Sequence, residues 1–176
     1  EDLGMLHKAE STMRRKREEL KNSRRKEMIG FRKIDPEVAM EKNTWFHLGR
    51  NSCEEILYCL RRIADPCEEH VDNNFVPLSK EQVKEYIPLR DTVLFLLRRT
   101  EKILQTDSYD EVDEVRREAE ELKDCLEKAR EAQMQRMQSS KENIAVAYLY
   151  LNLLQETREL TSSLRHLLRA SKGFRE

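Results

Sequence analysis

Acidic side chains and histidines at helical spacing are the first candidates for chemistry in this chain of 176 residues. Glu68 and Asp72 lie four positions apart and flank His70. Carboxylate and imidazole groups are common ligands of divalent metal ions. Glu120 and Asp124 repeat the carboxylate spacing, but so acidic a chain produces such pairs by chance. Glu68, His70 and Asp72 therefore form a candidate metal site, and the alternative is a solvated, charged helix end.

Polar residues also interrupt two stretches that otherwise read as buried. Buried amides and carboxylates need hydrogen-bond partners, so we expect the two sets to face each other. One interpretation is a hydrogen-bonded device that sets the register of a helix pair. The other is a site for a cation or small ligand inside a helical bundle. The residues are His47, Asn51 and Glu55 in the first set, and Asn152, Gln155, Glu156 and Glu159 in the second.

Motifs of the common enzyme classes are missing. The four glycines, at positions 4, 30, 49 and 173, are too scattered to form a phosphate-binding loop. There is no HExxH or GxSxG motif, and no histidine has an acid three positions before it, as a di-iron bundle requires. We predict that the protein is not an enzyme, with no catalytic residue and no cofactor other than a divalent metal. A metal-dependent enzyme is the remaining catalytic alternative.

Composition and periodicity predict an all-α fold. Charged residues make up 38% of the chain, and 4 Gly and 4 Pro are too few for the turns of a sheet protein. Apolar or small residues recur every three or four positions, the pattern of long helices packed nearly parallel. The clearest series are Phe46, Gly49, Cys53, Ile56, Leu60, Ile63, Cys67 and Val71, and Val112, Val115, Ala119, Leu122, Leu126, Ala129 and Gln133.

We expect an elongated, antiparallel, up-and-down bundle of about five long helices. Caps, turn residues and short connections place them at about 3–29, 36–73, 80–106, 111–138 and 141–171. Pro66 lies inside the second helix, where we expect a kink. The fifth helix is apolar nearly all round over 144–154 and should be the most buried, with Gly173 ending it.

Basic residues are concentrated near the start of the chain. Residues 14–33 hold ten basic and three acidic side chains, although the whole chain has a net charge of −1. This pattern divides the chain into a basic helix over 1–34 and a bundle over 35–176. The basic helix suits anionic lipid, RNA or an acidic partner, or is only a solvated face. The basic residues that we expect to face the membrane are Arg14, Arg15, Lys16, Arg17, Lys21, Arg24, Arg25 and Lys26.

Four cysteines, Cys53, Cys59, Cys67 and Cys125, have no CxxC spacing. We interpret them as thiols of a reducing compartment, mostly buried. The longest apolar run, residues 144–154, is too short to cross a bilayer of roughly 30 Å.

Two stretches resemble a known family. Residues 54–79, EEILYCLRRIADPCEEHVDNNFVPLS, and residues 148–174, YLYLNLLQETRELTSSLRHLLRASKGF, are similar to the PhoU-like cytoplasmic domain of bacterial inorganic phosphate transporters. The resemblance spans most of 44–174 and implies an antiparallel bundle of three-helix repeats that regulates phosphate uptake without catalysis. Some members hold metal clusters on Glu/Asp-x-x-x-Asp motifs. This chain has Gln155 and Glu159 where the resemblance would place an acidic pair.

The resemblance implies a cytoplasmic location at the inner face of the cell membrane. The implied partners are a membrane-embedded phosphate-transport core, upstream in the same polypeptide or separate, an anionic membrane surface and a second copy of the chain, with no nucleic acid. The basic helix would follow a last membrane span. Phosphate itself would meet arginines, for which the candidates are Arg50, Arg61, Arg62, Arg98 and Arg99. The alternative is a free-standing adaptor that dimerises through its first helix and binds partner helices.

Overall fold

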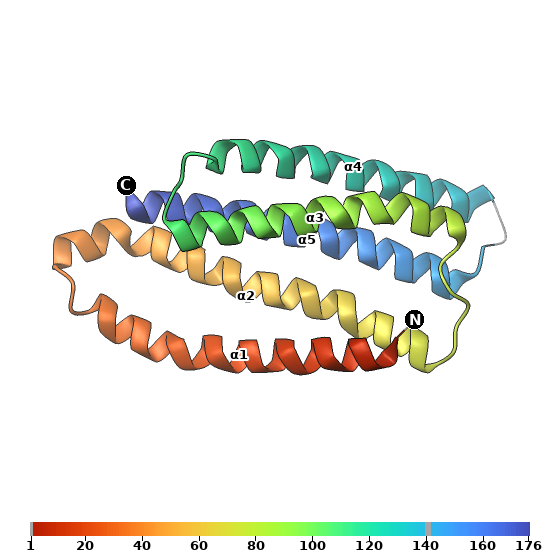
Figure 1. Ribbon diagram of the computed structural model, residues 1–176, viewed down its shortest axis with the longest axis horizontal. Coiled ribbons are helices and arrows are strands. Elements are labelled where there is room, and N and C mark those ends of the chain that lie inside the picture. The colour runs from red at the N-terminus through yellow and green to blue at the C-terminus, as the bar shows by residue number, and fades with distance from the viewer. Residues whose placement is uncertain (1, 140–141) are drawn as a thin grey trace.

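The computed structural model describes residues 2–139 and 142–176. Five helices follow one another, α1 (Leu3–Phe31), α2 (Pro36–Asp72), α3 (Lys80–Thr106), α4 (Val112–Ser139) and α5 (Ile144–Arg175). They run alternately up and down an elongated bundle (Figure 1), and the described ranges contain no strand. The predicted fold class is therefore confirmed. Residues 140 and 141, where the last connection and the start of the fifth helix were expected, lie outside the described ranges.

Short polar side chains cap the N-termini of helices, as the sequence predicts. Asp35 accepts a hydrogen bond from the backbone N–H of Glu37, and Pro36 takes the first helical position, where its missing N–H costs nothing. Ser79 and Gln82 form a reciprocal capping box, with hydrogen bonds of 2.9 and 3.1 Å.

Helix α5 is the central helix, because it packs against α2, α3 and α4. The heptad series predicted along α4, from Val112 to Gln133, is the set of residues that is buried there. The buried residues of α4 form one continuous apolar seam that packs against both α5 and α3, so the sequence period predicts the buried face directly.

Helix α2 departs from that simple picture. Its heptad residues, such as Ile56 and Leu60, are only half-buried, and the buried positions are Ser52, Cys59, Ala64 and His70. α2 packs on α5 with one side and on α1 with another, so the predicted stripe lies between its two neighbours. The helix runs on through Pro66 to Asp72.

Helix α1 lies along the flank of the bundle and packs against α2 alone among the described helices (Figure 1). None of its residues is buried. The predicted boundary at residue 34 falls in the connection between α1 and α2, and a separate domain over 1–34 stays a prediction.

Gly173 does not end the last helix, which continues to Arg175. A Cβ atom at this position would lie 2.6 Å from the indole ring of Trp45 on α2. Glycine is therefore needed here for the close approach of α5 to a tryptophan, a contact between distant residues that a helix-end rule does not detect.

Candidate functional site: the basic first helix and its contacts

The eight predicted basic residues of α1, from Arg14 to Lys26, are all exposed, and we call them the basic arm. Several bind acids of the same helix, including Arg14 with Glu10 at 3.1 Å and Lys16 with Glu19 at 2.8 Å. The hydrogen bond from Lys16 lowers the pKa of Glu19. Exposed pairs one helical turn apart are screened by solvent and contribute little to stability. The arm therefore presents a solvated cationic surface along one flank of the bundle.

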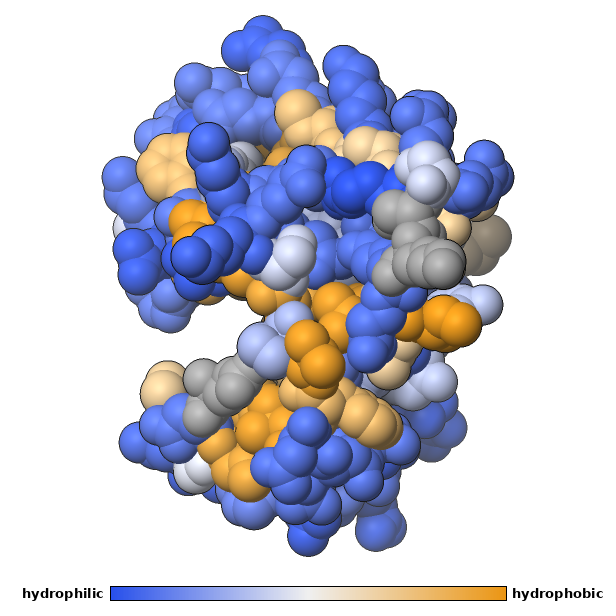
Figure 2. All heavy atoms as spheres, turned by 90° about the vertical axis from the view of Figure 1, so that its right-hand side faces the viewer, coloured by the Kyte–Doolittle hydropathy of each residue, from blue (hydrophilic) through white to orange (hydrophobic). Residues whose placement is uncertain are grey.

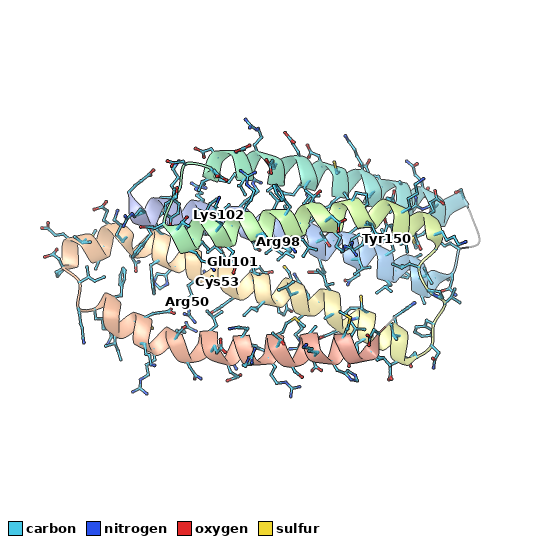
Figure 3. The ribbon with its side chains drawn as sticks, viewed as in Figure 1. Arg50, Cys53, Arg98, Glu101, Lys102 and Tyr150 are labelled. Atoms are coloured by element: carbon cyan, nitrogen blue, oxygen red, sulfur yellow. The ribbon has the colours of Figure 1, made fainter. Side chains whose placement is uncertain are left out.

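One arginine of α2 makes several of the contacts that join α1 to the rest of the protein. Arg50 lies between α1 and α2 (Figure 3), and its side chain is 8% exposed. It forms an ion pair with Glu27 and donates a 2.6 Å hydrogen bond to the carbonyl oxygen of Leu20, both on α1. Its Nε lies 3.3 Å from Glu54 on its own helix. Arg50 thus ties two points of α1 to α2.

Each end of α1 has a further contact. Near the start of the helix, His7 Nε2 lies 2.8 Å from a carboxylate oxygen of Glu68. Near its end, the rings of Phe31 and Phe46 stack with centroids 4.8 Å apart. These contacts and those of Arg50 hold α1 along its whole length.

A groove of about 510 Å³ runs between α1 and α2. Its walls carry both charge signs beside apolar surface around Met13, Leu20 and Tyr58. The charged lining residues are Arg14, Arg17, Lys21, Arg24 and Arg61, with Glu10, Glu18, Glu54 and Glu55. Five cations against four anions make this groove almost neutral, so it is a weak site for a free anion.

The far end of the arm combines charge with apolar surface. We call residues 24–40 the α1–α2 tip. Large apolar side chains are exposed there next to basic ones, and Met40 is 84% exposed. The exposed apolar residues are Met28, Ile29, Ile34, Val38 and Met40, and the exposed basic residues are Arg24, Arg25, Lys26, Arg32 and Lys33. Cationic and apolar side chains side by side are typical of protein surfaces that bind anionic membranes.

The candidate metal residues do not converge. His70 is buried and its Nε2 donates a 2.8 Å hydrogen bond to the carbonyl oxygen of Val76. Glu68 faces His7 instead, and Asp72 is exposed. Neighbours two apart on a helix point about 200° away from each other, which separates His70 from both acids. Throughout the described ranges, no three His, Cys, Asp or Glu side chains gather as metal ligands would.

The two predicted polar sets meet only in part, through Arg62. This α2 arginine lies 3.4 Å from Glu55 and 2.7 Å from Glu156 on α5. Asn152 donates a 2.9 Å hydrogen bond to the backbone carbonyl of Arg62. Burial raises the pKa of Glu156, and the neighbouring guanidinium of Arg62 opposes that rise. The arrangement joins α2 to α5.

The remaining members of the two sets lie outside this cluster. His47 and Asn51 are exposed on α2. Gln155 donates to Glu159 one turn along α5, at 2.9 Å. His47, Asn51 and Glu55 are spaced four residues apart and so share one face of α2, but that face turns partly to solvent.

The structure also contains a polar network that the sequence did not reveal. Gln82 and Gln133 are fully buried, and each donates a side-chain hydrogen bond to Glu142, at 2.8 and 2.7 Å. Beside them, Tyr150 donates a 2.6 Å hydrogen bond to Glu85. Burial, followed by the effect of Glu85, raises the pKa of Tyr150. The one signal in the sequence was glutamine at the seam position Gln133.

Most of the arginines proposed to meet phosphate are engaged with carboxylates. Arg99 binds Glu111, Glu114 and Glu118 at 2.8–3.1 Å and clamps α3 to α4. Arg61 pairs with Asp65 at 2.9 Å. Arginines that are already neutralised in this way attract a free phosphate less strongly.

Comparison of the chain with protein-family models, with curated proteins and with solved structures finds no match. In the described part of the chain, no helix has the length and apolar character needed to cross a bilayer.

Proposed function

We propose that the protein is a PhoU-like cytosolic regulatory domain of an inorganic phosphate transporter, held at the inner membrane face through α1 and the α1–α2 tip. The observation that carries the membrane part is the cationic and apolar surface of the tip, where Met40 is 84% exposed beside the basic residues. The phosphate-transport part rests on the sequence resemblance of residues 54–79 and 148–174.

The geometry suits a sensor whose first helix transmits its state. α1 packs on α2 alone among the described helices, and α2 packs on the central α5. A change in the bundle that moves α2 would therefore move α1 and its basic surface against the membrane. The role is non-catalytic, and the transport core is the partner that receives the signal.

The adaptor alternative needs a free apolar face on α1. Its half-buried apolar residues, such as Leu6, Met13 and Leu20, lie on the side of α1 that packs against α2 of the same chain. Dimerisation through α1 would compete with that contact, which favours the membrane role.

Vesicle sedimentation tests the membrane contact. The triple substitution Arg24→Gln, Arg25→Gln and Lys26→Gln should weaken binding to vesicles containing phosphatidylserine by on the order of 100-fold, at about 1 kcal/mol per cation. The matched control replaces Lys84, Lys102 and Lys128, exposed lysines of α3 and α4, by glutamine and should bind normally. Equal loss in both variants, or no binding by the natural protein, would contradict the membrane contact.

Uptake of radiolabelled phosphate tests the regulatory role. Cells that carry the gene with the tip substitutions should take up phosphate at an altered rate, because the domain no longer lies against the membrane. If uptake stays unchanged while the variant protein is released from the membrane, the protein does not regulate phosphate transport.

A further inference from the structure

Helix α3 carries a stripe of side chains that is exposed along most of its length, although Leu97 within it is half-buried and packs against the core. We define the α3 stripe as Ile87, Arg90, Leu94, Leu97, Glu101 and Leu104. Alternate spacings of three and four place these residues on one face of the helix. Ile87, Leu94 and Leu104 are 40%, 44% and 38% exposed, although large aliphatic side chains on a seam are normally buried.

The stripe borders an open groove. α2 and α3 do not pack directly against each other in the described part of the chain. Between them lies a cavity of about 350 Å³, lined by Leu97, Glu101 and Leu104 of α3, with Ile56 of α2 and Leu164 of α5. Figure 2 shows the molecule hollowed on one side between the lobe that contains α1 and α2 and the lobe that contains α3 and α4. In Figure 3, Glu101 lies on the side of α3 toward α2.

The chemical order along the stripe is self-complementary. Read from either end it is apolar, charged, apolar, apolar, charged, apolar, and the two charges are opposite in sign. If two α3 helices lie antiparallel, one register sets Leu94 against Leu97. The same register sets Ile87 against Leu104 and Arg90 against Glu101, and symmetry repeats every pair.

We propose that the occupant of this groove is a second copy of the same chain, docked through an antiparallel pair of α3 helices. The two-fold axis passes between residues 95 and 96. A two-fold interface uses the same patch on both subunits and must be self-complementary, which the stripe is. The Ile87 and Leu94 side chains of the second copy fill the apolar cavity, and its Arg90 reaches Glu101. Within one helix Arg90 and Glu101 are eleven residues apart, or about 16 Å, too far to pair with each other, and Arg90 there lies 2.7 Å from its neighbour Asp91.

The membrane contact and this interface use different flanks, so either can fail without the other. A helix from an unrelated protein would also cover apolar surface, but it would have no reason to match both charges in reverse order. The charge order therefore separates a second copy from other occupants.

Sedimentation equilibrium with charge-reversal variants tests the proposal. The natural protein should be dimeric. Arg90→Glu places Glu against Glu twice, Glu101→Arg places Arg against Arg twice, and each should raise the dimer dissociation constant by on the order of 100-fold. Lys102→Glu, on the same helix but about 100° away from Glu101, is the matched control and should leave the dimer intact.

Mixing the two single variants is the decisive measurement. A heterodimer of Arg90→Glu with Glu101→Arg again has opposite charges at both contacts, so dimers should return in the mixture and in the double variant. Such rescue also demonstrates that both singles are folded. A natural protein that stays monomeric up to its solubility limit, a dimer that tolerates both reversals, or a mixture that stays monomeric would each overturn the proposal.

Discussion

The side-chain amide of Asn152 on α5 donates a 2.9 Å hydrogen bond to the backbone carbonyl of Arg62 on α2. In a regular helix that carbonyl accepts from the N–H of the fourth residue along, which here is Pro66 and has none. Asn152 therefore supplies from a neighbouring helix the hydrogen bond that Pro66 removes. A half-buried amide and an interior proline, each unfavourable alone, stabilise each other and fix the register of α2 against α5.

This relationship predicts coupling between the two positions. Asn152→Leu should lower the free energy of unfolding by about 1–3 kcal/mol, because the carbonyl loses its donor. Pro66→Ala restores an N–H to the helix, so in that background Asn152→Leu should cost about 1 kcal/mol less. Urea denaturation of the four proteins measures the cycle. Gln155→Leu is the control, since Gln155 bonds within α5, and additive effects at Asn152 and Pro66 would refute the coupling.

Glu156 should make the stability of the protein depend on pH. Its folded-state pKa lies above the ordinary value of 4.5, chiefly because of burial. Between pH 4.5 and the higher folded-state pKa, the unfolded chain releases this proton more readily. Stability therefore falls as the pH rises through that window and is level above it. Glu156→Gln should remove this part of the dependence in thermal unfolding at a series of pH values.

Arg62→Met gives the complementary result. Without the guanidinium, burial alone acts on Glu156, so the pKa rises further and stability falls over a wider pH range. A pH profile unchanged in both variants would show that Glu156 ionises as it does in the unfolded chain.

Loss of Arg50 should loosen α1 while leaving the bundle folded. Arg50→Met removes the contacts to Leu20 and Glu27. Amide hydrogen exchange along α1 should accelerate at least about tenfold, while the amides of α5 keep their protection. Arg61→Met is the control, because it removes an exposed ion pair with Asp65 on the same helix. It should leave amide hydrogen exchange in α1 unchanged. Equal acceleration in α1 and α5 would mean that α1 is an integral part of the core.

The four thiols should differ in reactivity. Cys125 is exposed and should react first with an aromatic disulfide reagent at pH 8. Cys59 is buried, and burial raises its pKa to about 11, so it should react only after unfolding. Mass spectrometry of labelled peptides identifies the order. The substitution Cys125→Ser should abolish the fast phase, and a fast phase that persists would contradict the assignment.

The sequence predicted the helices well because each is a local, periodic signal. The series from Val112 to Gln133 gave the buried face of α4 directly, since that helix has one apolar seam. Pro36, Ser79 and Gln82 marked helix starts for reasons contained within a few residues. These features need no knowledge of the neighbours in space.

The contacts that join the helices were harder to predict. Arg62 appeared as one of several arginines, and nothing nearby in the chain indicated that Asn152 and Glu156 would meet it, 90 residues away in the case of Asn152. Gly173 looked like a helix end, although its small size serves the approach of Trp45. Such roles depend on which helices pack together, which periodicity alone does not specify.

The placement of α1 has a mechanical consequence. The start of α1 and the end of α5 lie toward opposite ends of the rod (Figure 1), and α1 contacts α2 near both of its ends and in the middle. Tension applied between the termini would pull α1 lengthwise along α2 and load all of these contacts at once. Under such a pull these contacts resist together, in shear. An outward force at Leu3 would instead break the contacts one at a time, beginning with the one between His7 and Glu68.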